Sequence, residues 1–183
     1  MPSNAYDAKG LLTAAIRDDN PVIFVSNKLC MQSSCEVPVE PFTEPLSKAR
    51  IVREVKDIKL IATGRMVADA ESAAGVLARS GIDAEVIDPR TLSPLDFESI
   101  LASVKKTSRA VVAHEAVQNC GIGAEIAARI SDEAFDFLDA PVKRVGAPFS
   151  PVPFAPVLEA TYLPTDQNIL DAVAEIFTDR VAR

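Results

Sequence analysis

The sequence predicts an α/β fold built on a three-layer, mostly parallel sheet. Apolar runs at residues 84–88 and 109–114 each end in charged or polar residues, and a helical pattern follows each run. Apolar strands that alternate with amphipathic helices are typical of parallel sheets, whose loops meet at the carboxyl edge. The chain has 183 residues and is 48% hydrophobic, which is enough to bury the core of one domain and leave an extra segment.

The N-terminal part does not repeat this pattern. Residues 7–17 carry apolar side chains at helical spacing, so we expect a short helix there with Asp7 as its N-cap. Residues 21–25 (PVIFV) predict a buried strand. Residues 35–45 combine prolines with acidic residues, which indicates an extended crossing segment. We therefore place a domain boundary at residue 45.

The second part, residues 46–183, repeats strand and helix along the chain. Residues 49–54 alternate charged and apolar side chains, which is typical of an edge strand. The other predicted strands are 57–64, 84–88, 109–114 and 141–145, and the predicted helices are 66–80, 94–105, 122–138 and 168–177. The crossover rule then predicts helices on both faces of a parallel sheet. Residues 146–156 are rich in proline and predict a stiff surface loop.

Composition excludes several classes of function. The net charge of −7 argues against nucleic-acid binding, which needs a high density of Lys and Arg. Three cysteines are too few for a disulfide framework or a four-thiolate zinc site, and they fit a reducing cytoplasm. The sequence has neither a secretory signal pattern nor an apolar run of about 18 residues, so we expect a cytoplasmic protein without a membrane span.

Three features near residue 120 allow both a structural and a chemical interpretation. His114, the only histidine, ends a strand at the edge where open sheets bind ligands, so it is a candidate base or phosphate contact. A structural histidine is the more common case, because no triad partner stands beside it. Gly121 and Gly123 open a helix, and a packing turn is favoured over an anion-binding loop. Cys120 is expected to be a small apolar filler.

The turn at Asp18 and Asn20 also allows two interpretations. Solvated acids at a helix end are the common case for such a run. Oxygen-rich turns of this kind also suit a hard cation.

Several ordered motifs carry a resemblance to a known family. They are residues 6–12 (YDAKGLL), 86–96 (VIDPRTLSPLD), 114–116 (HEA), 139–142 (DAPV) and 151–154 (PVPF). Together they resemble the beta subunit of thiamine-diphosphate-dependent 2-oxo acid dehydrogenases, a family that acts on pyruvate, branched-chain 2-oxo acids and acetoin. By this resemblance, residues 1–45 are the tail of a pyrimidine-binding domain, and residues 46–183 form a transketolase-type C-terminal domain.

The resemblance implies that this chain is only the C-terminal part of that subunit. The family's catalytic glutamate and histidine lie upstream, so it assigns no catalytic or cofactor-binding residue to this chain, and His114 is not the catalytic histidine. Thiamine diphosphate is then expected in the full complex and not on this chain alone. The implied partners are an alpha subunit, a second beta subunit and the dihydrolipoyl acyltransferase core.

The resemblance also implies two specific sites. Some members hold a structural potassium ion at a turn that matches Ala15, Asp18 and Asn20 here. Relatives dock the small basic binding domain of the acyltransferase, and Asp139 and the chain end at Arg183 are the docking candidates. The predicted role is therefore assembly and docking in an oxidative decarboxylase. The alternatives are a stand-alone interaction module and a small dinucleotide-binding enzyme, which the incomplete glycine pattern disfavours.

Overall fold

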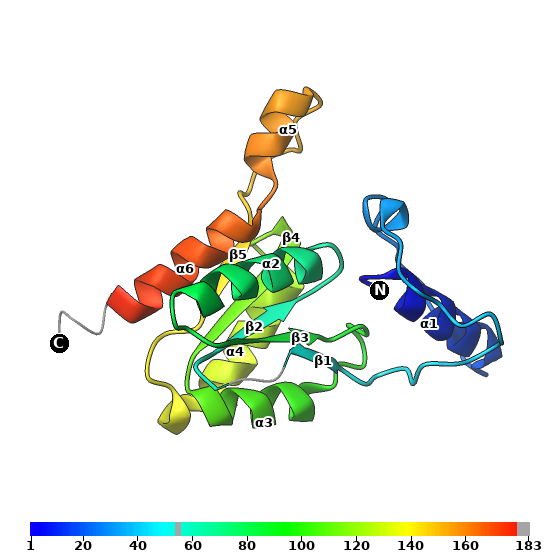
Figure 1. Ribbon diagram of the computed structural model, residues 1–183, viewed down its shortest axis with the longest axis horizontal. Coiled ribbons are helices and arrows are strands. Elements are labelled where there is room, and N and C mark those ends of the chain that lie inside the picture. The colour runs from blue at the N-terminus through cyan, green and yellow to red at the C-terminus, as the bar shows by residue number, and fades with distance from the viewer. Residues whose placement is uncertain (54–55, 179–183) are drawn as a thin grey trace.

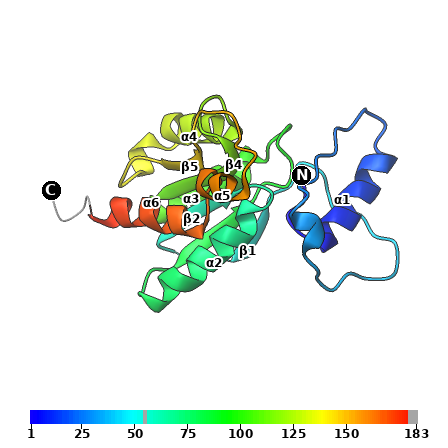
Figure 2. The same ribbon diagram turned by 90° about the horizontal axis from the view of Figure 1, so that it is seen from above.

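The protein is described here by a computed structural model that covers residues 1–53 and 56–178. A sheet with helices on both faces forms the body of the molecule (Figure 1). An N-terminal segment, residues 1–48, lies beside this body, as the view from above also shows (Figure 2). No helix in the part of the chain that is described is long and apolar enough to cross a membrane.

The described residues form a five-stranded sheet in the order β1-β3-β2-β4-β5. The strands are β1 (Arg50–Arg53), β2 (Ile58–Ala62), β3 (Ala84–Asp88), β4 (Ala110–Val117) and β5 (Lys143–Ala147). β1 pairs antiparallel with β3 at one edge, and the other pairings are parallel. The predicted mostly parallel sheet with an edge strand near residue 50 is therefore confirmed.

Two helical layers cover the sheet. The helices of the body are α2 (Met66–Arg79), α3 (Phe97–Thr107), α4 (Ile122–Glu133) and α6 (Asp166–Thr178). α2 and α6 bury their apolar stripes on one face, and α3 and α4 bury theirs on the other. β2, β3 and the first five residues of β4 are buried between these layers, which explains why the sequence there is mostly apolar. The predicted helix 122–138 is shorter, because α4 ends at Glu133 and the 3₁₀ turn Phe135–Phe137 follows it.

One buried ion pair interrupts the apolar core. Lys59 of β2 and Glu85 of β3 are side by side in register, and the Lys59 Nζ lies 2.7 Å from a Glu85 carboxylate oxygen. The Ser103 hydroxyl of α3 donates a hydrogen bond to the same carboxylate. Because both charges are paired and hydrogen-bonded, the sheet tolerates them in its interior.

The N-terminal segment contains α1 (Ala5–Arg17), which confirms the predicted helix. Its N-cap is Asn4 and not Asp7, since the Asn4 side chain accepts a hydrogen bond from the Asp7 backbone N–H at 2.8 Å. The predicted strand at 21–25 is wrong: these residues form no strand, and the Ile23 side chain is 91% exposed. A strand needs a neighbour for its backbone hydrogen bonds, and the described residues provide none beside this run.

The proline-rich residues 146–156 lead into a short helix that the sequence pattern did not predict, α5 (Pro156–Tyr162). Figure 1 shows α5 and its loop projecting from the body as an arm. The Tyr162 hydroxyl donates a hydrogen bond to the Ser150 carbonyl at 3.1 Å and ties the two ends of this arm together. Phe154, in the loop before α5, is fully exposed.

Candidate functional site at the carboxyl edge of the sheet

The chain order of the strands creates a switch point between β2 and β4. From β2 the chain crosses to β3 on one side, and from β4 it crosses to β5 on the other. Open α/β sheets bind ligands in the crevice outside the carboxyl ends of such strands. Here the N-terminal segment contacts this edge at β2, β3 and β4, so the edge is covered by the chain itself (Figure 2).

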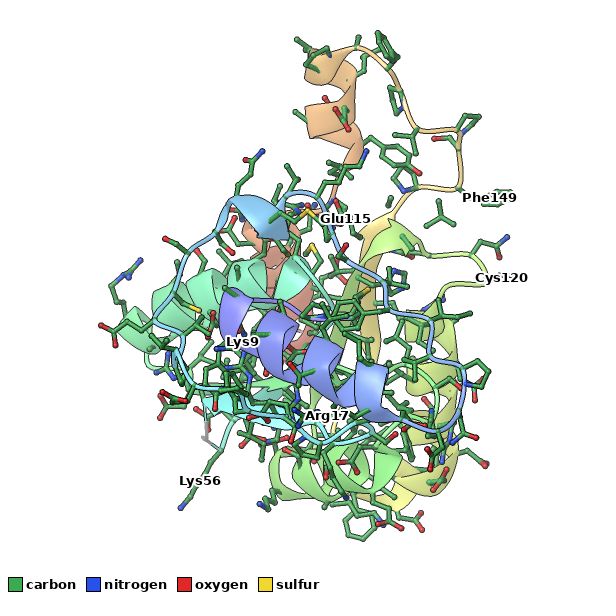
Figure 3. All side chains as sticks on the ribbon, turned by 90° about the vertical axis from the view of Figure 1, so that its right-hand side faces the viewer. Lys9, Arg17, Lys56, Glu115, Cys120 and Phe149 are labelled. Atoms are coloured by element: carbon green, nitrogen blue, oxygen red, sulfur yellow. The ribbon has the colours of Figure 1, made fainter. Side chains whose placement is uncertain are left out.

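At the end of β4, Glu115 joins the N-terminal segment to the body. The Asn27 side-chain amide donates a hydrogen bond to one Glu115 oxygen, and the Arg65 guanidinium lies 3.6 Å from the other. Arg65 is held in place by an ion pair with Asp69 and a hydrogen bond to the Pro164 carbonyl. Figure 3 labels Glu115 close to the light-blue turn of the N-terminal segment.

At the end of β3, buried charges form a second connection, which we call the Asp7–Arg90 latch. Asp7 is fully buried, with its two carboxylate oxygens 3.0 Å from Arg90 Nη1 and 3.3 Å from Arg50 Nε. Arg90 also contacts Glu44 at 2.8 Å and donates to the Lys48 carbonyl at 3.0 Å. The latch therefore connects α1, the extended crossing segment and the loop after β3.

Asp88, the last residue of β3, forms hydrogen bonds next to the Asp7–Arg90 latch. Burial raises the pKa of its carboxyl group, while hydrogen bonds from the Ser3 hydroxyl and the Arg90 backbone N–H oppose this rise. These donors lie 2.6 Å and 2.9 Å from its oxygens. Asp88 therefore fixes the start of the N-terminal segment and the conformation of Arg90, whose φ is +57°.

His114 lies inside the body and not at the covered edge. Its side chain is 2% exposed, and neither ring nitrogen has a hydrogen-bond partner with acceptable geometry among the described residues. The ring packs under three glycines, since a Cβ built on Gly121, Gly123 or Gly146 would lie 2.4–3.0 Å from it. The glycine turn is therefore a packing turn, as predicted, and it packs specifically against the imidazole.

Burial lowers the pKa of His114 below its ordinary value of 6.5, and the nearby Arg144 charge adds to this effect, while the Ala116 backbone opposes it. At pH values between the lowered pKa of His114 in the folded protein and 6.5, the imidazole is protonated more often in the unfolded chain than in the folded protein. We therefore expect the free energy of unfolding to fall as the pH drops below about 6.5. Urea denaturation at a series of pH values tests this, and the His114→Gln variant is expected to lose that part of the slope.

The three cysteines are free thiols, of which Cys30 is half-buried and Cys35 and Cys120 are exposed. Cys120, expected to be an apolar filler, is exposed with φ +56°, so that prediction is wrong. The turn before α4 places its side chain outside the core. Burial raises the pKa of the Cys30 thiol, and the nearby Glu115 charge raises it further, so a thiolate at this position is disfavoured.

The turn after α1 is closed by its own hydrogen bonds. One Asp18 oxygen accepts from the Asn20 backbone N–H at 2.8 Å and from its side-chain amide at 3.0 Å, and these bonds lower the pKa of Asp18. Asp18 and Asn20 are exposed, and Ala15 is half-buried one turn earlier in α1. The potassium site at these three residues stays a prediction.

Of the two docking candidates, Asp139 lies in the described part of the chain. Asp139 follows the 3₁₀ turn before β5, and its half-exposed carboxylate accepts a hydrogen bond from Arg109 at 2.6 Å. The neighbouring Phe135 and Phe137 side chains are exposed. Arg183 lies outside the residues that the structure describes.

Comparison with known proteins identifies the body of the molecule. Residues 47–169 match the family described as transketolase, C-terminal domain. A solved structure described as a split gene transketolase, inactive beta4 tetramer, shares the fold with a TM-score of 0.62 and 28% identity. The match covers 80% of this chain and 47% of that one.

Two relatives from Bacillus subtilis (strain 168) match over a longer range. The beta subunit of acetoin:2,6-dichlorophenolindophenol oxidoreductase is 50% identical over 176 residues, which are 96% of this chain and 52% of that protein. The beta subunit of the pyruvate dehydrogenase E1 component is 45% identical over 177 residues, 96% of this chain and 54% of that protein. The chain thus spans about half the length of these curated relatives. It belongs to the transketolase C-terminal domain family and is homologous to the beta subunits of pyruvate dehydrogenase and acetoin oxidoreductase.

Proposed function

We propose that this chain is the C-terminal portion of the beta subunit of a thiamine-dependent 2-oxo acid dehydrogenase, with a role in subunit assembly and docking. The observation that carries the proposal is the covered carboxyl edge. The edge where open sheets bind ligands is held by the Asp7–Arg90 latch and by the Asn27–Glu115 contact. This arrangement supports an interface between two bodies, although a cavity of about 720 Å³ remains between the segment and the loop after β3.

Exposed apolar side chains on the N-terminal segment support the same proposal. Ile16, Ile23 and Val25 are 75%, 91% and 49% exposed, and buried charges anchor the same segment to the body. Apolar side chains exposed together on one segment are typical of a surface that a further part of a protein covers. The homologous beta subunits are about twice as long as this chain, so their remaining half is a suitable occupant.

The described residues offer no cluster of side chains that would suggest a cofactor-bound metal. No group of three or more His, Cys, Asp or Glu side chains in the described ranges is arranged to hold a metal ion. His114 is buried beneath the glycines and unavailable to a substrate. We propose that the cofactor belongs to the full complex, and we derive no catalytic step from this chain.

Mixing experiments with the matching alpha subunit and thiamine diphosphate test the proposal. Light scattering measures the size of the complex. Product release measures turnover, with pyruvate, branched-chain 2-oxo acids and acetoin tested as substrates in turn. We expect association without turnover. Turnover would contradict the assignment of the catalytic residues to the missing half, and a lack of association would contradict the assembly role.

Paired variants show whether association uses the N-terminal segment. Ile16→Asp places a charge on its exposed side, whereas Phe135→Asp changes a side chain of matched exposure on the opposite part of the body. The exposed fractions are 75% and 74%, so both variants should fold equally well. We expect only Ile16→Asp to reduce association. Equal effects would argue against this surface.

Self-association is the second candidate function. The structural neighbour with 28% identity is described as an inactive tetramer of beta chains, and the arm around α5 exposes Phe149, Phe154 and Val157 here. A stand-alone module of this kind would form a homo-oligomer and would not bind the alpha subunit. Sedimentation of the chain alone, and then of the mixture, distinguishes a stable homo-oligomer from the proposed complex.

We expect Asp139→Asn to weaken docking of the acyltransferase's basic binding domain by about 3- to 10-fold. The half-exposed carboxylate follows two exposed phenylalanines, Phe135 and Phe137, within four residues of the chain, a combination that suits a basic partner with apolar side chains. Calorimetric titration at two salt concentrations measures the loss. Asp132→Asn on α4 is the control, and an equal loss there would indicate general electrostatic attraction instead of a defined site.

A further inference from the structure

A groove of about 430 Å³ lies on the N-terminal segment, and we call it the α1 groove. One wall is the face of α1 that carries Ala5, Ala8 and Leu12, and the other is the loop 24–33 with Phe24 and Met31. The Leu12 and Met31 side chains are 43% and 68% exposed. The groove therefore presents open apolar surface, as clefts that bind apolar groups do.

The arm, residues 148–162, is a second apolar surface on the same chain. Its exposed large apolar side chains are Phe149, Val152, Phe154, Val157 and Leu158. Four prolines and the hydrogen bond between Tyr162 and Ser150 restrict its conformation. A segment that is already held in one shape loses little entropy on binding, so the arm is suited to insertion into a groove.

The two surfaces carry single charges of opposite sign. Residues 148–165 contain one charged side chain, Glu159, and residues 21–35 contain one, Lys28, whereas the whole chain is 25% charged. Both side chains are exposed, and neither has an ion-pair partner among the described residues. Interface centres are depleted in charge and enriched in Phe and Met, and opposite charges fix the register of two surfaces. Arm and groove thus complement each other in both respects.

Within one chain the two surfaces do not meet. Figure 1 shows α5 and the light-blue turn Cys30–Gln32 on the same side of the molecule but apart, and the view from above agrees (Figure 2). Phe154 is fully exposed, so its side chain is not packed against its own chain. A second copy can supply the missing surface to both, because every copy carries one arm and one groove.

The available area favours a reciprocal contact. A buried aromatic side chain contributes about 150–250 Å², so an arm with two phenylalanines and three aliphatic side chains offers on the order of 500 Å². Specific interfaces bury about 1,200–2,000 Å² in total, counted over both partners. One arm in one groove falls near the lower limit, whereas two such contacts related by a two-fold axis lie within the range and close the assembly.

We propose that two copies of this chain exchange arms, so that the arm of each copy lies in the α1 groove of the other, with Glu159 opposite Lys28. This inference rests on the self-association described above as the second candidate function and names its contact. It uses neither the Asp7–Arg90 latch nor the exposed side of Ile16 that is assigned to the alpha-subunit complex.

Sedimentation velocity of the chain alone, over a range of concentrations, tests the arm. Phe154→Asp is expected to weaken dimerisation by about 30-fold or more, as the loss of an aromatic anchor predicts. The variant should fold, because this side chain is fully exposed. Phe135→Asp is the control, since Phe135 is 74% exposed on the body. A dimer that both variants weaken equally would overturn the role of the arm.

A charge exchange tests whether the groove receives the arm. Glu159→Lys and Lys28→Glu are each expected to weaken dimerisation by about 3- to 10-fold, and the double variant is expected to restore it. Lys28→Glu combined with Glu71→Lys is the control, because Glu71 is an exposed acid on α2 and this pair gives the same net charge. Restoration by both pairs, or by neither, would contradict the pairing of arm and groove.

The outcome is separable from that of the assembly proposal. A chain that stays monomeric at all concentrations but still associates with the alpha subunit would overturn the exchange of arms alone. A dimer that depends on Phe154 and on the charge exchange, without association with the alpha subunit, would support the exchange and contradict the assembly role.

Discussion

Replacing Gly123 by alanine is expected to lower the free energy of unfolding by about 2–3 kcal/mol. A Cβ at this position would lie 2.4 Å from His114 Cδ2, 2.5 Å from its Nε2 and 3.3 Å from Val112 Cγ1. The ring cannot move aside, because Gly121 and Gly146 also pack against it. Alanine is normally the better helix former by about 1 kcal/mol, so the sign of the effect is opposite to the local helix propensity.

Gly75→Ala provides the matched control in urea denaturation. Gly75 lies in the middle of α2, and a Cβ there would meet nothing within 4 Å. This variant should be neutral or more stable. In the double variant Gly123→Ala with His114→Ala, the two effects should not add, because the alanine methyl group enters the space of the removed ring. A Gly123→Ala protein as stable as Gly75→Ala would contradict the packing described for His114.

The elements of the body follow from local periodicity, which is why the sequence predicts them well. Strands between two helical layers are apolar on both faces, and α2 and α6 each carry one apolar stripe. The failure at residues 21–25 has a physical reason. Their apolar, β-branched composition favours a strand, but a strand forms only beside another one.

The contacts that define the sites join residues that are far apart in the sequence, and a local sequence pattern cannot predict such pairs. Asp7 and Arg90 are 83 residues apart in sequence, and Asn27 and Glu115 are 88 apart. The sequence indicates part of the packing around His114, since two of the three glycines that contact it follow within ten residues. Gly146 comes from the next strand, so only the sheet order brings it to the ring.

The Asp7→Ala variant is expected to destabilise the Asp7–Arg90 latch by about 3–5 kcal/mol. The loss of the carboxylate leaves Arg90, which is 5% exposed, with Glu44 as its remaining ion-pair partner. It also removes the partner of Arg50 at 3.3 Å. A buried charge that loses its partner keeps its desolvation cost, so the effect exceeds that of a surface ion pair.

The loss should be local, because the latch holds the N-terminal segment whereas the two apolar cores lie within the body. Amide hydrogen exchange is therefore the best measurement: we expect faster exchange in α1 and in the loop after β3, with β2 and β4 unchanged. Asp19→Ala, an exposed acid just beyond the end of α1, is the control. If both variants exchanged alike, the latch would not be what holds the segment across the edge. If Asp7→Ala also abolished association with the alpha subunit, the ordered position of this segment would be part of the assembly surface.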